Sequence, residues 1–234
     1  MEWDRVLTVT NVERMLVGDL FTQGHLGGLL LTLTIAAIAI LGSTVLGMAL
    51  GVMRASKRRW LWFPALIYIQ TIRSVPLLIL IFWVYFVPPY FHVETSKFVS
   101  VTIALTFFTT AYIAEYIRGG ILAVPETERE AARTLGLSPV QIQLYVVLPQ
   151  AYFTMVPAIT GRYIVTVINT SLAFLIGLSE LTDIGRQINI RLQTSPIEVY
   201  LTIMAIYFVV NRALSALMRL LERRSRFNRL FVRI

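Results

Sequence analysis

The chain has 234 residues, of which 56% are hydrophobic and 15% are charged. Soluble domains contain about 45–50% apolar and about 25% charged residues, so this composition argues against a water-soluble enzyme. The formal net charge is +8, but the cations gather directly after long apolar runs, which is typical of membrane-protein loops and not of a nucleic-acid-binding stripe. The absence of cysteine excludes disulfides and thiolate metal sites, and His25 and His92 lie too far apart in sequence to suggest a local metal motif.

Five apolar runs are long enough to cross a bilayer, because a helix needs about 20 residues to span the hydrocarbon core. They predict an all-α integral membrane protein, organised as a single transmembrane domain over residues 1–234. The first run contains no ionisable residue and follows an acidic start without the basic stretch of a signal peptide, so it is expected to stay as a membrane helix. Arg73 and Pro76 interrupt the second run, but splitting it at Pro76 would leave two pieces too short to cross. The predicted spans are residues 26–53, 60–87, 99–124, 150–178 and 199–221.

Loop charges predict the orientation, because Lys and Arg accumulate in cytoplasmic loops. Thirteen cations fall on one side of the five spans and five on the other, while Arg73, Arg162 and Arg212 lie within apolar runs. The cation-rich side includes residues 54–59 and the six arginines of residues 219–233. The N-terminus is therefore expected outside the cytoplasm and the C-terminus inside it.

The segment between the third and fourth spans, residues 125–149, is too polar to insert into the bilayer and predicts two short helices. Pro125 suits a first helical turn and Gly136 suits a helix C-cap, while Ser138 before Pro139 is typical of an N-cap followed by the first helical residue. Three glutamates, Glu126, Glu128 and Glu130, place negative charge near the positive end of the first helix dipole. From periodicity alone, an ordinary surface helical hairpin is the alternative.

This loop also contains a pattern that extends over 20 residues. A Glu-Ala-Ala triplet is followed after three residues by Gly, and then by a Val-x-Leu-Pro end; the residues are Glu130, Ala131, Ala132, Gly136, Val146, Leu148 and Pro149. The pattern resembles the EAA loop of ATP-binding-cassette (ABC) importer permeases, with Val146 in place of the usual Ile. Further matching segments are RSVPLL from Arg73, AYIAEYIRGGI from Ala111, LPQAY from Leu148 and NTSLAFLIGLSELT from Asn169. From about Gly24 to Leu221 the chain resembles the polar amino-acid permeases of the histidine, glutamine, glutamate and opine group.

The resemblance implies a type I importer fold in the bacterial cytoplasmic (inner) membrane. It also implies two ATP-binding-cassette ATPase subunits, a second permease subunit of the same or similar kind, and an extracytoplasmic amino-acid-binding protein. Glu130, Ala131, Ala132 and Gly136 would then contact the ATPase and couple ATP hydrolysis to alternating access. The chain has no GxxxxGK[ST] phosphate loop, so we expect it to bind no cofactor itself and the partner ATPase to use the ATP.

Ionisable residues inside spans are costly and therefore call for a partner or a watery cavity. Glu115 and Arg118 are three residues apart on one predicted helix, so mutual neutralisation is expected. Arg73 could cap a neighbouring helix end or face the pathway, although its position in the matching segment favours a structural role. For Arg212, pairing between helices is as plausible as a functional role.

The fourth span has a polar face formed by Arg162, Thr166, Asn169 and Thr170, because these residues recur at helical spacing. Packing could explain the threonines, but the guanidinium points to a pathway wall that binds a carboxylate. An acidic substrate such as glutamate or aspartate is therefore favoured, and glutamine or another polar amino acid stays possible. Many relatives have Lys where this chain has Ile168, and the alternative for Arg162 itself is an ion pair with Glu115 or another helix.

Two other function classes compete with an ATP-driven importer. An ion-coupled secondary transporter should contain inverted repeats or a coupling carboxylate in mid-membrane, and Glu115 is the only carboxylate well inside a span. A membrane scaffold that only recruits an ATPase would need the EAA loop but no pathway. The sequence leaves open whether the permease pairs with itself or with a similar chain.

Overall fold

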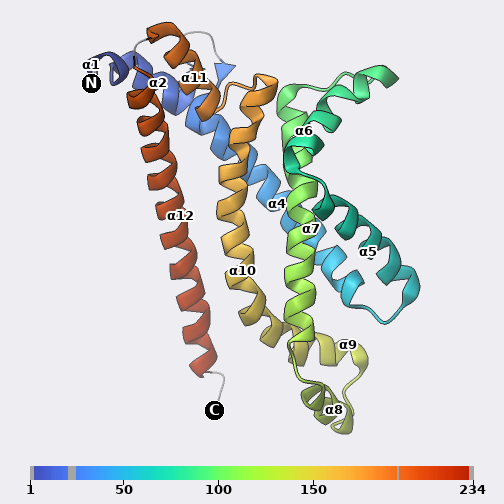
Figure 1. Ribbon diagram of the computed structural model, residues 1–234. Coiled ribbons are helices and arrows are strands. Elements are labelled where there is room, and N and C mark those ends of the chain that lie inside the picture. The colour runs from blue at the N-terminus through green and yellow to red at the C-terminus, as the bar shows by residue number, and fades with distance from the viewer. Residues whose placement is uncertain (1–2, 21–24, 194, 232–234) are drawn as a thin grey trace. The chain divides into compact units, whose positions relative to one another are not determined.

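The computed structural model describes residues 3–20, 25–193 and 195–231, with backbone only for residue 221 and residues 223–231. The all-α class is confirmed, since in this part of the chain the antiparallel pair β1–β2 is the one non-helical element (Figure 1). In chain order the elements are α1 (Trp3–Val6), α2 (Val9–Val17), β1 (Gly18–Asp19), β2 (His25–Leu26), α4 (Gly28–Ala55), α5 (Arg59–Ser74), α6 (Leu77–Phe86), η1 (Pro88–Phe91), α7 (Lys97–Leu122), α8 (Glu126–Thr134), α9 (Pro139–Gln141), η2 (Ile142–Val147), α10 (Leu148–Asn169), η3 (Thr170–Ile176), α11 (Leu181–Leu192) and α12 (Pro196–Phe231).

Four of the described helical segments are long and apolar enough to cross a membrane. They are α4, α7, the continuous segment Pro139–Ile176 and the Pro196–Leu220 part of α12. A fifth span is reached if the bent pair of α5 and α6 is counted as one. Helix α12 continues past the predicted end at residue 221, and the side chains of most of the predicted basic tail lie outside the described residues.

The second predicted span is two helices, α5 and α6, instead of one interrupted helix. The break falls at Val75 and Pro76, and Val75 has the extended conformation that a residue before proline prefers (φ −104°, ψ 134°). Pro76 has no N–H to donate to the preceding turn, so the α-helical ladder stops there. Each piece is shorter than the roughly 20 residues that a straight crossing needs.

The second predicted loop helix differs from expectation because it does not end before the fourth span. Ser138 caps it, accepting from the Gln141 N–H, and Gln141 accepts from the Ser138 N–H at 2.8 Å, which completes the predicted N-terminus. The helix then passes through the π-helical segment η2 directly into α10. The wide π turn immediately precedes Pro149, which has no N–H for a regular α-helical bond.

The contacts group the chain into two compact units, each built from three separate stretches. Unit 1 comprises Met1–Leu41, Pro76–Thr106 and Ile164–Leu214. In this unit α11 packs on α2 and on the start of α12, around the buried side chains of Met15, Leu181, Ile184, Ile188, Val199 and Ile203. The short amphipathic helix α11 lies between the fourth and fifth predicted spans, where the sequence interpretation expected only a connection.

A buried carboxylate organises the start of α11 in unit 1. Glu180 is the N-cap: its Oε1 accepts from the Asp183 N–H and its Oε2 from the Thr182 N–H, each at 3.0 Å. The Tyr207 hydroxyl donates to Oε2 at 3.1 Å, and Thr32 reaches the same oxygen at 3.4 Å. Burial raises the pKa of Glu180 to about 7, although these hydrogen bonds oppose the rise.

Unit 2 comprises Gly42–Val75, Phe107–Tyr163 and Ser215–Ile234. Two glycines let α4 approach α7 closely: a Cβ on Gly47 would lie 2.6 Å from Ile113 Cγ2, and one on Gly51 would lie 2.7 Å from Ile117 Cβ. This GxxxG spacing is a known route to close helix packing in membranes, and it is a signal that the sequence interpretation missed. A further core connects α7, the loop helices and α10; its buried members are Ile113, Ile117, Ile121, Val124, Ala132, Ile142, Val147 and Ala151.

Candidate functional site

Helix α8 carries the predicted coupling residues and is defined by local signals at both ends. Pro125 is the N-cap, one position before the predicted first turn, and Glu126 and Glu128 lie in the first turn. Arg133 donates to Glu126 at 3.1 Å, which supports the exposed side of the helix. Gly136 follows the C-cap with φ +79°, a conformation that favours glycine, so its predicted role at the helix end is confirmed.

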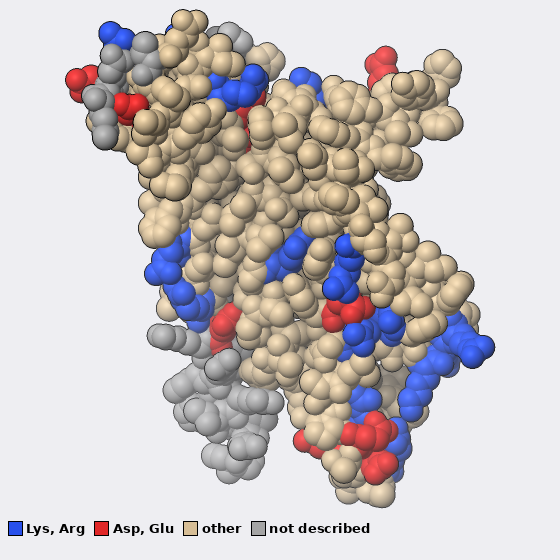
Figure 2. All heavy atoms as spheres, in the orientation of Figure 1, with Lys and Arg blue, Asp and Glu red and all other residues tan. Residues whose placement is uncertain are grey.

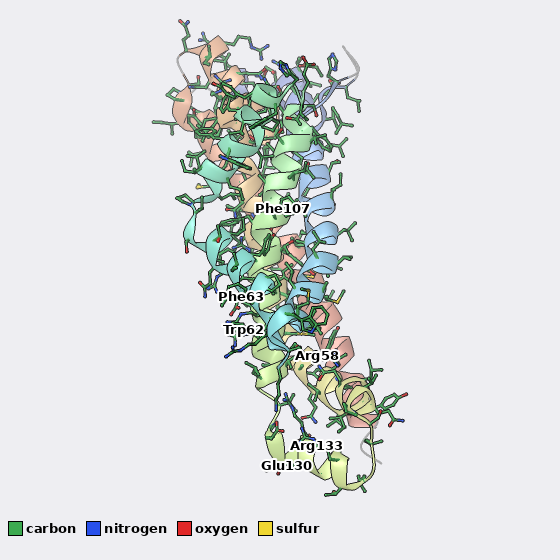
Figure 3. All side chains as sticks on the ribbon, turned by 90° about the vertical axis from the view of Figure 1, so that its right-hand side faces the viewer. Arg58, Trp62, Phe63, Phe107, Glu130 and Arg133 are labelled. Carbon is green, nitrogen blue, oxygen red and sulfur yellow. The ribbon has the colours of Figure 1, made fainter. Side chains whose placement is uncertain are left out.

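The predicted coupling residues divide between an exposed surface and the core. Glu130 and Ala131 are exposed, and Gly136 has open space where a Cβ would be. Ala132 is buried in the core that α8 shares with α7 and α10. Figure 3 shows Glu130 and Arg133 on this short helix. Leu135 is 81% exposed and adds an apolar side chain to the exposed surface.

Three contacts connect α8 to the membrane helices of unit 2. Arg129 donates to the carbonyl of Ile121 in the last turn of α7, and Gln150 at the start of α10 donates to Glu128. Ala132 adds the apolar contact with both helices. A displacement of α8 would therefore act on α7 and α10 together. Figure 1 shows α8 in the loop that joins these two helices.

A polar cluster in unit 2 surrounds Glu115 on α7. The predicted pairing with Arg118 is confirmed: Arg118 Nη2 and Nε donate to Glu115 Oε2 at 2.9 and 3.1 Å. Two more arginines come from other helices, with Arg54 Nε 3.8 Å from Glu115 Oε1 and Arg73 Nη1 3.9 Å from Oε2. Three guanidinium groups thus surround one carboxylate, and this part of unit 2 has an excess of positive charge.

Arg162 lies in the same unit, stacked on aromatic rings of α7. Its side chain is buried, and its guanidinium carbon is 3.9 Å from the centre of the Tyr112 ring and 5.0 Å from that of Phe108. Arg73 also lies over Tyr112, at 5.3 Å. The Tyr112 ring therefore connects the Arg162 guanidinium with the cluster around Glu115 through cation–π contacts.

The other predicted pathway residues lie further along the same helix and belong to unit 1. Thr166 is buried in α10, Asn169 ends that helix half-buried, and Thr170 is buried at the start of η3. The Thr170 hydroxyl donates to the Val167 carbonyl at 2.7 Å, a local bond that is common for helical threonines. Their assignment to a substrate pathway stays a prediction.

The comparisons with known proteins agree with these features. The pattern of the family described as "Binding-protein-dependent transport system inner membrane component" matches residues 43–227. A probable glutamine ABC transporter permease of Bacillus subtilis (strain 168) is 35% identical over 208 residues, covering 86% of this chain and 95% of the relative. An octopine transport system permease of Rhizobium meliloti is 36% identical over 206 residues, covering 84% of each chain.

A solved structure shares the fold as well as the sequence. A chain from the crystal structure of an amino acid ABC transporter with histidines superposes with a TM-score of 0.78 at 33% identity, covering 84% of this chain and 92% of that one. The family match extends over most of the chain and includes the loop of residues 125–149. This chain therefore belongs to the binding-protein-dependent transport system inner membrane components, the permease subunits of ABC importers, in which a separate subunit hydrolyses ATP.

Proposed function

We propose that this chain forms the translocation pathway of an ATP-driven importer of polar amino acids, with acidic amino acids as the favoured substrates. The relatives named for glutamine and octopine support the amino-acid class. The two matching sequences extend over more than four fifths of this chain, so the likeness includes the membrane helices as well as the loop.

The observation that carries the proposal is the construction of α8. Its exposed surface presents Glu130, Ala131 and Leu135, while Ala132 and Arg129 attach it to α7 and α10. Through such a helix, a movement of an ATPase can displace two membrane helices together as one rigid body. Alternating access between two states requires a displacement of this kind. Two ATPase subunits, a second permease and an extracytoplasmic amino-acid-binding protein complete the proposed assembly.

The preference for an acidic substrate rests on the positive charge in unit 2. Arg73, Arg54 and Arg118 surround a single carboxylate, Glu115, and a fourth guanidinium, that of Arg162, lies over the Tyr112 ring that Arg73 also contacts. A guanidinium can bind a carboxylate through two parallel hydrogen bonds, whereas a basic side chain would meet like charge. In this proposal Arg162, together with Thr166, Asn169 and Thr170 on the same helix, contacts substrate when the pathway opens.

The orientation belongs to the same proposal. With α8 in the cytoplasm, where the ATPase resides, the N-terminus lies outside and the C-terminus inside. The positive residues 54–59 then face the cytoplasm, in agreement with the distribution of cations in the sequence.

Reconstituted vesicles test the proposal directly. The permease, its ATPase and its binding protein are purified together, and uptake of labelled glutamate, aspartate, glutamine and arginine is measured with ATP supplied on the ATPase side. We expect uptake to need all three components and to be strongest for the acidic amino acids. Uptake driven by an ion gradient without the ATPase would indicate a secondary transporter, and ATPase recruitment without any uptake would indicate a scaffold.

A further inference from the structure

The turn between α4 and α5 encloses a surface cavity of about 770 Å³ within unit 2. Its lining residues are Ser56, Lys57, Arg59, Trp60, Trp62, Phe63 and Pro64. Figure 3 shows Arg58, Trp62 and Phe63 in this region, and Figure 2 shows basic side chains gathered at the turn. The cavity therefore combines cationic and aromatic side chains in one short segment.

The lining of the cavity carries positive charge. Lys57 and Arg59 are exposed, and within the described part of the chain neither forms an ion pair. The sequence contains no Asp or Glu at all between residues 20 and 93. The first turn of α5 likewise contains no acidic residue, and the N-cap Arg58 makes no side-chain cap, so the positive end of this 16-residue helix adds to the field. This chemistry favours an anion.

The apolar side of the cavity continues along the helix. Trp60 and Phe63 are exposed, and Ile67, one further turn along α5, is exposed as well, so the three form an apolar stripe at helical spacing. Trp62 is held in place by the guanidinium of Arg54, which lies 4.9 Å from the ring centre. A stripe that begins at two cations and continues as apolar surface matches a molecule with an anionic head and an apolar tail. Tryptophan is also enriched at the headgroup level of membranes.

We propose that this cavity binds an anionic phospholipid. Lys57 and Arg59 contact the phosphate, and an acyl chain follows Trp60, Phe63 and Ile67. A free phosphate ion would use the two cations but would leave the aromatic surface uncovered. Ala55, which directly precedes the cavity, packs against the core that also buries Ala132 of α8. A bound lipid would therefore stabilise the core that holds α8 against the membrane helices.

Native mass spectrometry of the purified transporter tests this proposal without requiring transport. The complex is prepared in detergent and titrated with phosphatidylglycerol or with phosphatidylcholine. We expect phosphatidylglycerol to remain bound and phosphatidylcholine to bind at least tenfold more weakly. Lys57→Gln and Arg59→Gln should each weaken phosphatidylglycerol binding by about fivefold, the effect of one cation near an anionic headgroup. Trp60→Ala should weaken it through the loss of apolar contact.

Arg58→Gln is the matched control, because Arg58 is an exposed cation between the two lining cations but does not line the cavity. We expect this variant to change binding by less than twofold. An equal loss in Arg58→Gln would show diffuse surface attraction and overturn the site. Equal binding of phosphatidylcholine would overturn the assignment of an anionic lipid. Displacement of the lipid by millimolar inorganic phosphate would reassign the cavity to a free phosphate ion and also overturn the proposal.

Discussion

The guanidinium of Arg162 is stacked on the Tyr112 ring, 3.9 Å from its centre, inside unit 2. The contact places a guanidinium, a group that can bind a carboxylate through two parallel hydrogen bonds, against an aromatic face of α7. The relationship identifies Arg162 as the residue through which the substrate preference can be tested most directly.

Replacing Arg162 by Gln should reduce uptake of acidic amino acids by about 30-fold or more, because loss of one partner of a buried charge pair costs about 2–5 kcal/mol. Arg162→Lys should rescue only in part, since an ammonium lacks the planar fork. Arg212→Gln is the control, because Arg212 is an exposed cation in α12. Uptake by reconstituted vesicles and basal ATPase activity are measured together. Unchanged affinity and rate in Arg162→Gln would remove this residue from the substrate site.

Gly136 should be required for coupling because its φ of +79° is unfavourable for a β-branched residue. Gly136→Val should cost about 1–3 kcal/mol at the end of α8, so ATPase stimulation by the binding protein and uptake should both fall while the chain still inserts into the membrane. Gly136→Asn should retain more activity, since Asn tolerates this conformation. Gly119→Val is the control, because Gly119 also has open space but has no positive φ. Normal coupling in Gly136→Val would contradict the assignment of the loop.

Single cysteines should report the orientation directly, because the native chain contains none. In intact cells, Cys at positions 58 and 226 should be protected from a membrane-impermeant thiol reagent, and Cys at positions 94 and 190 should be labelled. Positions 94 and 190 are used instead of the neighbouring His92 and Gln193, whose positive φ would strain a cysteine. Permeabilised cells should label all four positions. The opposite pattern in intact cells would reverse the proposed topology.

Gly51→Ala should destabilise the packing of α4 on α7. The new Cβ would lie 2.7 Å from Ile117 Cβ and 2.9 Å from the Ala114 carbonyl oxygen, and neither atom can move aside by side-chain rotation. We expect a loss of about 1–3 kcal/mol, the usual cost of overpacking, measured as a lower melting temperature in detergent. Gly119→Ala should have little effect because that site is open. Equal melting temperatures for Gly51→Ala and the native chain would contradict the close approach of these helices.

Glu180 should make stability depend on pH. It lies beyond the membrane-crossing segment Pro139–Ile176. Burial raises its pKa from 4.5 to about 7. The folded state therefore holds the proton more tightly, so the stabilisation is fully present below about pH 4.5 and is lost as the pH rises through about 7. Between pH 5 and pH 8 the contribution of Glu180 to the free energy of unfolding should fall by about 2–3 kcal/mol.

The measurement compares melting temperatures of the native chain and Glu180→Gln in detergent between pH 5 and pH 8. The native chain should lose more stability over this range than the variant, whose amide does not titrate. Other groups contribute equally to both proteins, so the difference isolates Glu180. Parallel curves would show that its pKa is not raised.

Local signals explain why some of the candidate site could be predicted. Gly136 and the Ser138–Pro139 pair mark helix ends through conformations and hydrogen bonds that involve only nearby residues. The continuation of the second loop helix through η2 into α10 was not predicted, because proline at position 149 usually interrupts a helix and a π turn has no simple sequence signal.

The membrane-crossing helices follow from the sequence, because in a bilayer about 20 apolar residues must satisfy their own backbone hydrogen bonds and therefore form a helix. Helical spacing paired Glu115 with Arg118, which lies one turn away on α7, whereas an ion pair between Glu115 and Arg162 was only an alternative. Arg54 and Arg73 approach Glu115 from α4 and α5, and Arg162 reaches the adjacent Tyr112 from α10. Periodicity carries no information about which helices become neighbours, so this cluster of charge arises only when side-chain packing, including the Gly47 and Gly51 contacts, brings the helices together.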